Sequence, residues 1–138
     1  MKVVLEPGAI MPRREHADDA GMDLFSREKV CLWPGGEHTF DTGVHIAIPQ
    51  GYFGHIESKS GLNVNDNIVS CGGIIDSGYN GSVAVKLYNF GKRSKIFEVG
   101  QKVAQIIIQP YIAPEMELVD ELPETDRGSD GFGSTGSF

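Results

Sequence analysis

The sequence predicts an all-β domain, either a sandwich or a barrel, and three observations support this fold class. Short runs rich in β-branched residues recur along the 138 residues, each bounded by Gly, Pro, Asn or Asp. Turn signals follow one another at intervals of about ten residues, and glycine is abundant, with 18 residues. No segment keeps a 3.6-residue hydrophobic period, so no long amphipathic helix is expected.

The individual elements follow from the same patterns. We expect strands at the apolar runs 44–48, 52–56, 83–88 and 103–108. Segments that combine Gly with Pro or a polar residue predict turns at 33–36, 49–51 and 98–100. The one helix expected is short, at residues 60–65.

The length predicts one domain with a proper hydrophobic core. Residues 121–126, Glu-Leu-Pro-Glu-Thr-Asp, are acidic and contain proline, which is typical of a hinge. We therefore expect a barrel domain at residues 1–120, followed at 121–138 by the hinge and a flexible, glycine-rich arm.

Composition and charge narrow the possible partners and the location. The net charge of −7 and the pI of about 5.0 argue against nucleic acid or an anionic membrane as the main partner. A small anionic ligand stays compatible, because a few cations or a divalent metal can capture a phosphate. There is no signal peptide and no apolar run of membrane-spanning length, so we expect a soluble, cytoplasmic protein. Cys31 and Cys71 form no CxxC pair; we expect free thiols, with a disulfide between them as the alternative.

The last residues of the chain combine features suited to a phosphorylated, planar ligand. Four glycines at 128, 131, 133 and 136 let the backbone approach a ligand closely. Arg127, the hydroxyls of Ser134 and Thr135, and the backbone amides can hold phosphate oxygens. Phe132 offers a flat aromatic face. The alternative is a solvated tail, and the segment alone does not decide between the two.

Two segments could hold a metal ion and a phosphate. Asp23 lies between apolar residues and could orient metal-bound waters, although its pentapeptide alone favours a turn aspartate. Lys59, Ser60 and Gly61 precede the predicted helix, whose first amides could seat a phosphate. The alternative at this place is an ordinary N-cap by Ser58 or Ser60.

Two further segments could carry the chemistry. Asp76 ends an apolar run within a predicted hairpin or tight turn, where a carboxylate could orient a water as general base. Tyr79 could offer its ring to a sugar; the alternative is a turn aspartate and a core tyrosine. Gln105 interrupts an apolar strand, and its amide must find a partner, either a ligand or a backbone carbonyl.

Taken together, five segments in order resemble the motifs of the trimeric dUTP pyrophosphatases (dUTPases). The resemblance covers nearly the whole chain. The family patterns are A-G-x-D-L, P-R-S-G-L, G-x-I-D-x-x-Y-x-G, G-[DE]-[RK]-[IV]-A-Q and R-G-x-G-G-F-G-S-T-G. They are matched in turn at residues 20–24, 58–62, 73–81, 100–105 and 127–136.

The resemblance implies a fold, an assembly and a reaction. It implies a distorted jelly-roll β-barrel, assembled as a homotrimer with three shared active sites. The implied reaction hydrolyses dUTP to dUMP and pyrophosphate with Mg²⁺, which limits uracil incorporation into DNA and supplies dUMP for thymidylate synthesis. Asp76 would orient the water that attacks the α-phosphorus, and Asp23 would hold the hydrated metal.

The resemblance also implies how the substrate is bound. Main-chain groups around Gly73 would read uracil, and Tyr79 would pack on the deoxyribose. Lys59, Ser60, Gly61 and Gln105 would contact phosphate. In the arm, Phe132 would cover the uracil, while the remaining arm residues, Arg127, Gly133, Ser134 and Thr135, would grip the γ-phosphate.

The chain departs from the family pattern at four residues, and two other functions compete. Ser58 and Lys59 replace the usual proline and arginine of the second motif, Gln101 occupies a position where the family often has an acid, and Asp130 replaces a glycine of the arm. Lysine keeps the charge but loses the bidentate fork. A dCTP deaminase of the same fold shares the segment 75–81, and a dUTP-binding regulatory protein is the second alternative. The arginine, phenylalanine and Ser-Thr tail favours the dUTPase.

Overall fold

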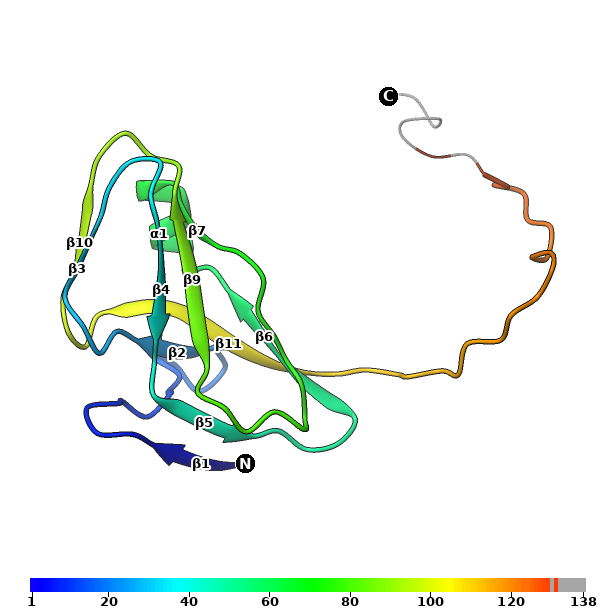
Figure 1. The fold of residues 1–138 in the computed structure, drawn as a ribbon, viewed down its shortest axis with the longest axis horizontal. Helices are drawn as coiled ribbons and strands as arrows, with labels where there is room; N and C mark the ends of the chain where they lie inside the picture. Colours follow the sequence, from blue (N-terminus) through cyan, green and yellow to red (C-terminus); the bar gives the residue numbers. More distant parts are fainter. Residues whose placement is uncertain (130, 132–138) are drawn as a thin grey trace.

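The computed structural model describes residues 1–129 and 131, and Figure 1 shows their arrangement. Within these residues the chain forms eleven strands and one helix. The N-terminal half contains β1 (Lys2–Leu5), β2 (Met22–Phe25), β3 (Val30–Leu32), β4 (Glu37–Asp41), β5 (Val44–Ala47), β6 (Tyr52–Glu57) and α1 (Ser60–Asp66). The remainder contains β7 (Ile68–Ser70), β8 (Ile74–Ile75), β9 (Ala84–Asn89), β10 (Lys95–Phe97) and β11 (Lys102–Pro110).

The all-β prediction is confirmed. The four expected strands correspond to β5, β6, β9 and β11, and the expected short helix is α1. The other strands were not predicted from the sequence, since most have only two to four residues. Such short segments give too few residues for a period of two to stand out.

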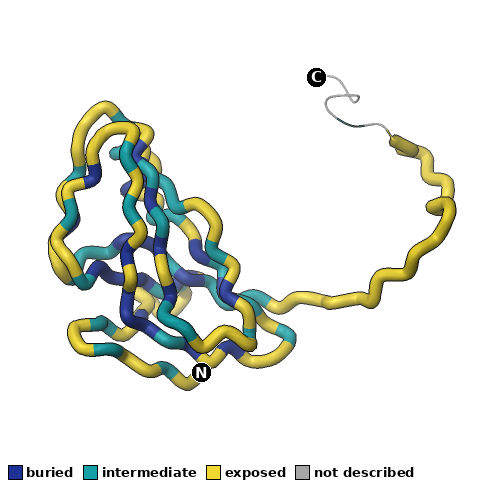
Figure 2. Tube along the Cα trace, viewed as in Figure 1, coloured by how far each residue is buried: buried dark blue, intermediate teal, exposed yellow. Residues whose placement is uncertain are grey.

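The strands pair in four antiparallel sheets that wrap around one core. The largest has the order β2-β11-β6-β8, and a second has the order β4-β9-β7. Two pairs, β1-β5 and β10-β3, complete the body. Figure 2 shows the buried residues gathered inside these sheets. A sheet with one face on the core explains the alternating burial along β9.

Two aromatic side chains occupy the centre of the core. Phe40 and Phe97 are both fully buried and meet edge to face, with ring centroids 5.2 Å apart. Buried polar groups near them are satisfied: the Asn89 amide donates to the carbonyl of Leu32 at 3.0 Å. Among the described residues, no buried side-chain nitrogen or oxygen lacks a hydrogen-bond partner.

The chain leaves the body after β11. Residues 112–122 pair with no described strand and are all exposed, and Figure 1 shows them extending away from the barrel. Cys31 and Cys71 are free thiols on the surface, so the alternative of a disulfide is not realised. Within the described part of the chain, α1 and any other helical turn are too short and too polar to cross a membrane.

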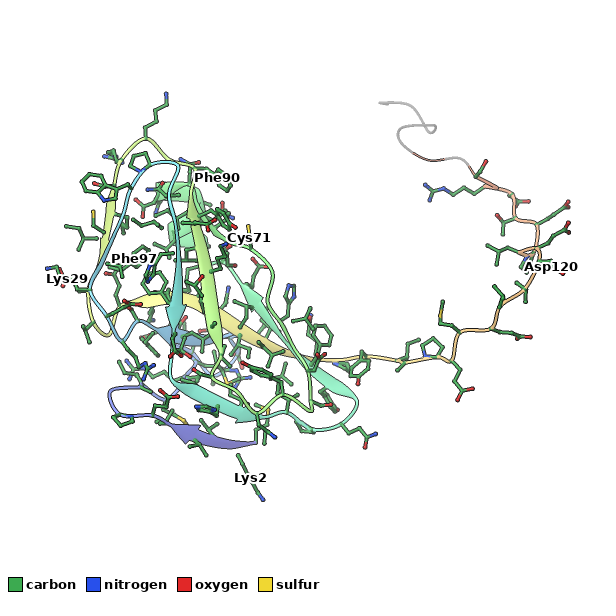
Figure 3. All side chains as sticks on the ribbon, in the orientation of Figure 1. Lys2, Lys29, Cys71, Phe90, Phe97 and Asp120 are labelled. Atoms are coloured by element: carbon green, nitrogen blue, oxygen red, sulfur yellow. The ribbon has the colours of Figure 1, made fainter. Side chains whose placement is uncertain are left out.

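Replacing Phe97 tests how far the core depends on its central aromatic pair. Phe97→Ala should lower the free energy of unfolding by about 3–5 kcal/mol, because it leaves a cavity. Phe90→Ala is the matched control: Phe90 lies at the edge and is 68% exposed, so its loss should cost less than about 1 kcal/mol (Figure 3). Urea unfolding followed by circular dichroism measures both. Equal losses would show that the pair is not central.

Candidate functional site

Strand β11 organises the site, because it pairs with β2 on one side and with β6 on the other. Its residue Gln105 lies opposite Asp23 of β2 and opposite Glu57 of β6. Residues directly opposite one another in antiparallel strands point to the same face. The sheet therefore sets Asp23, Gln105 and Glu57 in one row.

A β-bulge in β11 brings a fourth side chain to the same face. Lys102 pairs with Phe25, but Ala104 already pairs with Leu24, so β11 carries one extra residue here, Val103. In a regular strand, residues three apart point to opposite faces. The bulge shifts this phase, and Lys102 consequently shares a face with Gln105.

Lys102, Asp23 and Lys59 form a cluster of two cations on one buried carboxylate. The Lys59 ammonium donates to Asp23 Oδ1 at 2.5 Å, and the Lys102 ammonium lies 2.8 Å from Oδ2. We call these three residues the lysine–aspartate cluster. Burial would raise the pKa of Asp23, but the hydrogen bonds from Lys102 and Lys59 outweigh burial and lower it below its ordinary value. Asp23 is therefore ionised at neutral pH.

Lys59 reaches Asp23 from the start of α1. It is the N-cap residue with an extended backbone, and no side chain caps the helix. Ser58 instead bonds to Ser70, accepting from its amide at 2.9 Å. The alternative of an N-cap by Ser58 or Ser60 is therefore wrong. Ser60 and Gly61 are exposed beside the lysine–aspartate cluster and are accessible to a ligand.

Gln105 satisfies its amide within the protein and depends on a glycine across the strand pair. Its Nε2 donates to the carbonyl of Ser58 at 3.1 Å, which is the backbone-carbonyl alternative from the sequence. A Cβ at Gly21 would collide with Gln105 Oε1, so Gly21 leaves room for the amide. The side chain is thus fixed on the Asp23 side of the sheet.

Asp76 lies at the other end of the same sheet and directly follows β8 in the chain. Gly73 precedes β8 with φ +115°, and a Cβ there would come within 2.5 Å of Ile56 Cβ, so this position requires glycine. Asp76 itself is exposed. With Phe53, Ile74 and Tyr111 it lines a hollow of about 260 Å³, which we call the Asp76 hollow.

Tyr79 is held beside Asp76 but does not enter the core. Its amide donates to the carbonyl of Asp76 at 3.0 Å, and its hydroxyl donates to the carbonyl of Ser82 at 3.0 Å. The side chain is 45% exposed, so the alternative of a core tyrosine is wrong. The ring is available for stacking next to the Asp76 hollow.

The two clusters are far apart within one chain. Gln105 pairs with Glu57, whereas Asp76 follows the residue that pairs with Gly54. The separation is about 13 Å along β6 and about 10 Å across the strands. These are backbone separations, and together they set the two Cα atoms roughly 16 Å apart. The Asp76 carboxylate and the Gln105 amide therefore do not contact each other within one chain.

Several predicted residues lie in or beyond the tail. Arg127 is described and lies in an exposed turn at 126–129. Phe132, Gly133, Ser134 and Thr135, and the departure Asp130, lie outside the described residues. Gln101, another departure, accepts a hydrogen bond from the Glu98 amide and fixes the turn before β11.

Sequence reasoning missed four residues of the site. Lys102 belongs to a quoted motif but had no assigned role, because regular alternation would place it away from Gln105. Phe53, Ile74 and Tyr111 look like ordinary strand residues, and only strand pairing brings them to Asp76. No signal in the sequence marks either the bulge or this pairing.

The donor set around Asp23 fits one class of metal site. In the described part of the chain, no three His, Cys, Asp or Glu side chains come together to form a metal cage. Mg²⁺ commonly keeps several waters and binds one carboxylate together with substrate phosphates. Asp23 supplies one ionised carboxylate to such a site, but it is only 3% exposed and each of its oxygens contacts a lysine, so a hydrated Mg²⁺ here would be held mainly by substrate phosphates.

Comparison with known proteins identifies the same family over most of the chain. The model of the dUTPase family matches residues 8–136. A deoxyuridine 5'-triphosphate nucleotidohydrolase of Gloeothece citriformis is 42% identical over 134 residues, 96% of this chain and 92% of its own. The enzyme of that name from Mus musculus is 40% identical, covering 97% of this chain and 83% of its own.

Solved structures show the same likeness. The Staphylococcus bacteriophage 80alpha dUTPase with dUPNHPP has a TM-score of 0.88 and 32% identity, over 98% of this chain and 97% of that chain. A mutant dUTPase from phage phi11 of S. aureus, described for its coordination of a structural Mg(II) ion, has a TM-score of 0.81 and 31% identity, over 87% and 96%. The likeness confirms the predicted jelly-roll β-barrel.

The pH dependence of stability tests the charge state of Asp23. Its lowered folded pKa stabilises the protein above the unfolded value of about 3.9, and this stability is lost as the pH falls through the folded pKa. Asp23→Asn should therefore be less stable than the parent by about 1–3 kcal/mol at pH 7, with the gap shrinking below about pH 4.

Urea unfolding at pH 7, 5, 4 and 3 measures this gap. Asp18→Asn, which replaces an exposed aspartate nearby, serves as the control and should show no comparable gap. A gap for Asp23→Asn that stays constant down to pH 3 would contradict the lowered pKa.

Proposed function

Because the chain belongs to the dUTPase family, we propose that the lysine–aspartate cluster and the Asp76 hollow together hydrolyse dUTP to dUMP and pyrophosphate. The observation that carries this proposal is the position of Asp76. Its carboxylate is exposed at the mouth of a partly apolar hollow, where it can meet both a flat base and a water. The chain is accordingly a dUTP diphosphatase.

Uracil and deoxyribose bind at the Asp76 hollow in this proposal. Phe53, Ile74 and Tyr111 supply apolar surface for a flat ring, and the backbone around Gly73 offers donors and acceptors for the base edge. A tight pocket there rejects the methyl group of thymine. Tyr79 packs on the deoxyribose and leaves no room for a 2′-hydroxyl, consistent with its exposed ring.

In this proposal the triphosphate binds beside Asp23 and Gln105, in the row that β11 forms with its neighbouring strands. Lys59, Ser60, Gly61 and Gln105 contact phosphate oxygens, and Asp23 would help to hold a hydrated Mg²⁺. The bound ion would neutralise charge on the triphosphate. Support comes from the ionised, buried carboxylate of Asp23 and from the exposure of Ser60 and Gly61.

The reaction needs one positioned water. Asp76 accepts a proton from this water, whose oxygen forms a bond to the α-phosphorus. The bond between the α-phosphorus and the α,β-bridging oxygen breaks, and the electron pair leaves with pyrophosphate. Phosphoryl transfer of this type depends mainly on positioning and charge neutralisation.

The C-terminal arm completes the proposed site. Phe132 covers the uracil, while Arg127, Gly133, Ser134 and Thr135 hold the γ-phosphate. Closure of an arm excludes bulk water and orders the substrate. The family match continues to residue 136 and so includes this segment.

We also propose that the active protein is a homotrimer with sites shared between subunits. The backbone positions of Asp76 and Gln105 are roughly 16 Å apart in one chain, which favours a site built from parts of different copies. The tail supports association: Ile112, Met116, Leu118 and Leu122 are each at least 83% exposed, which is unusual for a free monomer. Figure 3 shows the tail side chains around Asp120 standing clear of the barrel.

The alternatives from the sequence have less support. The relatives found act, by their names, on deoxyuridine triphosphate, which favours the dUTPase over a dCTP deaminase. A purely regulatory dUTP-binding protein would not need Asp76 exposed at the hollow. A cytoplasmic location, and the exclusion of nucleic acid and membranes as partners, stay proposals from the composition.

Product analysis with Mg²⁺ tests the proposed reaction. The protein should release dUMP and pyrophosphate from dUTP, with no comparable turnover of dCTP, dTTP or UTP. Asp76→Asn should lower kcat by about 10²–10⁴-fold, because the base is lost, while a non-hydrolysable dUTP analogue still binds. Glu37→Gln, on β4 in a different sheet from both clusters, is the control and should keep its turnover. Full turnover by Asp76→Asn would remove Asp76 as the base.

A charge in the tail tests the proposed assembly. Leu118→Asp should weaken association by about 2 kcal/mol per contact, or about 30-fold, because an apolar side chain is no longer buried. Sedimentation velocity should then show monomers at concentrations where the parent is a trimer, with loss of dUTP turnover. Val99→Asp, at another exposed apolar residue, should stay trimeric. A monomeric parent with full activity would refute the shared site.

A further inference from the structure

Lys102 belongs to the lysine–aspartate cluster, but none of the proposed substrate-binding roles involves it. Its ammonium contacts two carboxylates at once, Asp23 Oδ2 at 2.8 Å and Glu15 Oε2 at 2.9 Å. Lys102 reaches Asp23 because of the bulge at Val103, which leaves Val103 without a partner in the pairing of β11 with β2.

Lys59 and Lys102 differ in what else they can bind. Lys59 has one carboxylate partner and stands next to Ser60 and Gly61, where phosphate would lie. When Lys59 turns to a phosphate, its hydrogen bond to Asp23 Oδ1 is lost. Asp23, only 3% exposed, is then left with Lys102 as the cation that holds its carboxylate in place.

Lys102 is held so that it does not leave with Lys59. Its second partner, Glu15, is on the segment that pairs with the backbone of Asp23, since the Asp23 amide donates to the carbonyl of Arg13 at 2.8 Å. The two partners of the Lys102 ammonium, Asp23 and Glu15, thus lie on backbone segments that are hydrogen-bonded to each other. Phosphate binding at Lys59 removes neither of these contacts.

We propose that Lys102 is a positioning residue of the hydrolysis: it holds the Asp23 carboxylate in the orientation that would face a hydrated Mg²⁺ while Lys59 moves from Asp23 to the phosphate. This inference rests on the proposed metal role of Asp23. In this inference Lys102 acts through Asp23, which its ammonium contacts at 2.8 Å. Glu15 holds Lys102 in turn.

The test is the Mg²⁺ dependence of nucleotide binding, measured apart from turnover. Calorimetry gives the affinity of a non-hydrolysable imido analogue of dUTP in EDTA and across Mg²⁺ concentrations. Lys102→Met should raise the Mg²⁺ concentration for half-maximal binding by about 10-fold or more, the usual effect of losing a group that orients a metal-binding residue. The affinity in EDTA should change far less. Lys102→Arg should restore the parent's Mg²⁺ dependence.

Two further variants make the result specific. Lys95→Met removes a lysine whose exposure is similar to that of Lys102 and which pairs with Asp66 at 2.8 Å. Together with Lys59 and Lys102, Lys95 lines a second hollow, separate from the Asp76 hollow. Its Mg²⁺ dependence should shift less than about twofold, since it does not touch Asp23. Glu15→Gln changes an exposed side chain and should shift the dependence in the direction of Lys102→Met by a smaller factor. If Lys102→Met does not fold, Glu15→Gln therefore tests the proposal in its place.

The outcomes separate this inference from the proposed function. Asp23→Ala should abolish the Mg²⁺-linked gain in affinity; if it does not, the metal role of Asp23 fails. If Asp23→Ala has this effect but Lys102→Met and Glu15→Gln match the parent, only the role of Lys102 is overturned. An equal shift in Lys95→Met would also overturn it, because the effect would then be general charge loss.

Discussion

The pairing of β11 with both β2 and β6 is the constraint on which the rest of the site depends. These strands come from distant parts of the chain, and only their register sets Asp23, Gln105 and Glu57 in one row. A slip by one residue would turn every one of these side chains to the opposite face. Fully buried neighbours in β11, such as Ala104 and Ile106, oppose such a slip because they would leave the core.

The same strand accounts for the charges that collect around Asp23. A buried carboxylate is unfavourable unless it is paired, and the bulge supplies a lysine that a regular strand would point away. The result is a protein of net charge −7 with a local pair of cations where a triphosphate is proposed to bind. The binding of an anion thus depends on local geometry and not on the overall charge.

The parts of the fold and of the site that could be predicted are those that neighbouring residues in the sequence determine. The runs at β5, β6, β9 and β11 carry enough β-branched residues to be recognised, and the motif around Asp76 places it correctly after a strand. The functional pairing of Lys59 with Asp23 could not be predicted, since 36 residues separate them and the contact depends on two strand registers. Likewise, nothing in the sequence says that Asp76 and Gln105 lie at different ends of one sheet.

The tail after β11 carries a further consequence for the life of the newly made chain. If this exposed segment pairs as a strand, alternation would set the apolar residues 112, 116, 118 and 122 on one face and Glu115, Glu117 and Glu121 on the other. An uncovered apolar strand is an aggregation hazard. Here the acidic edge makes two free tails repel each other, and Pro114 removes a backbone donor. The tail is thus protected against self-stacking during the interval in which the barrel has folded but its partners have not yet arrived.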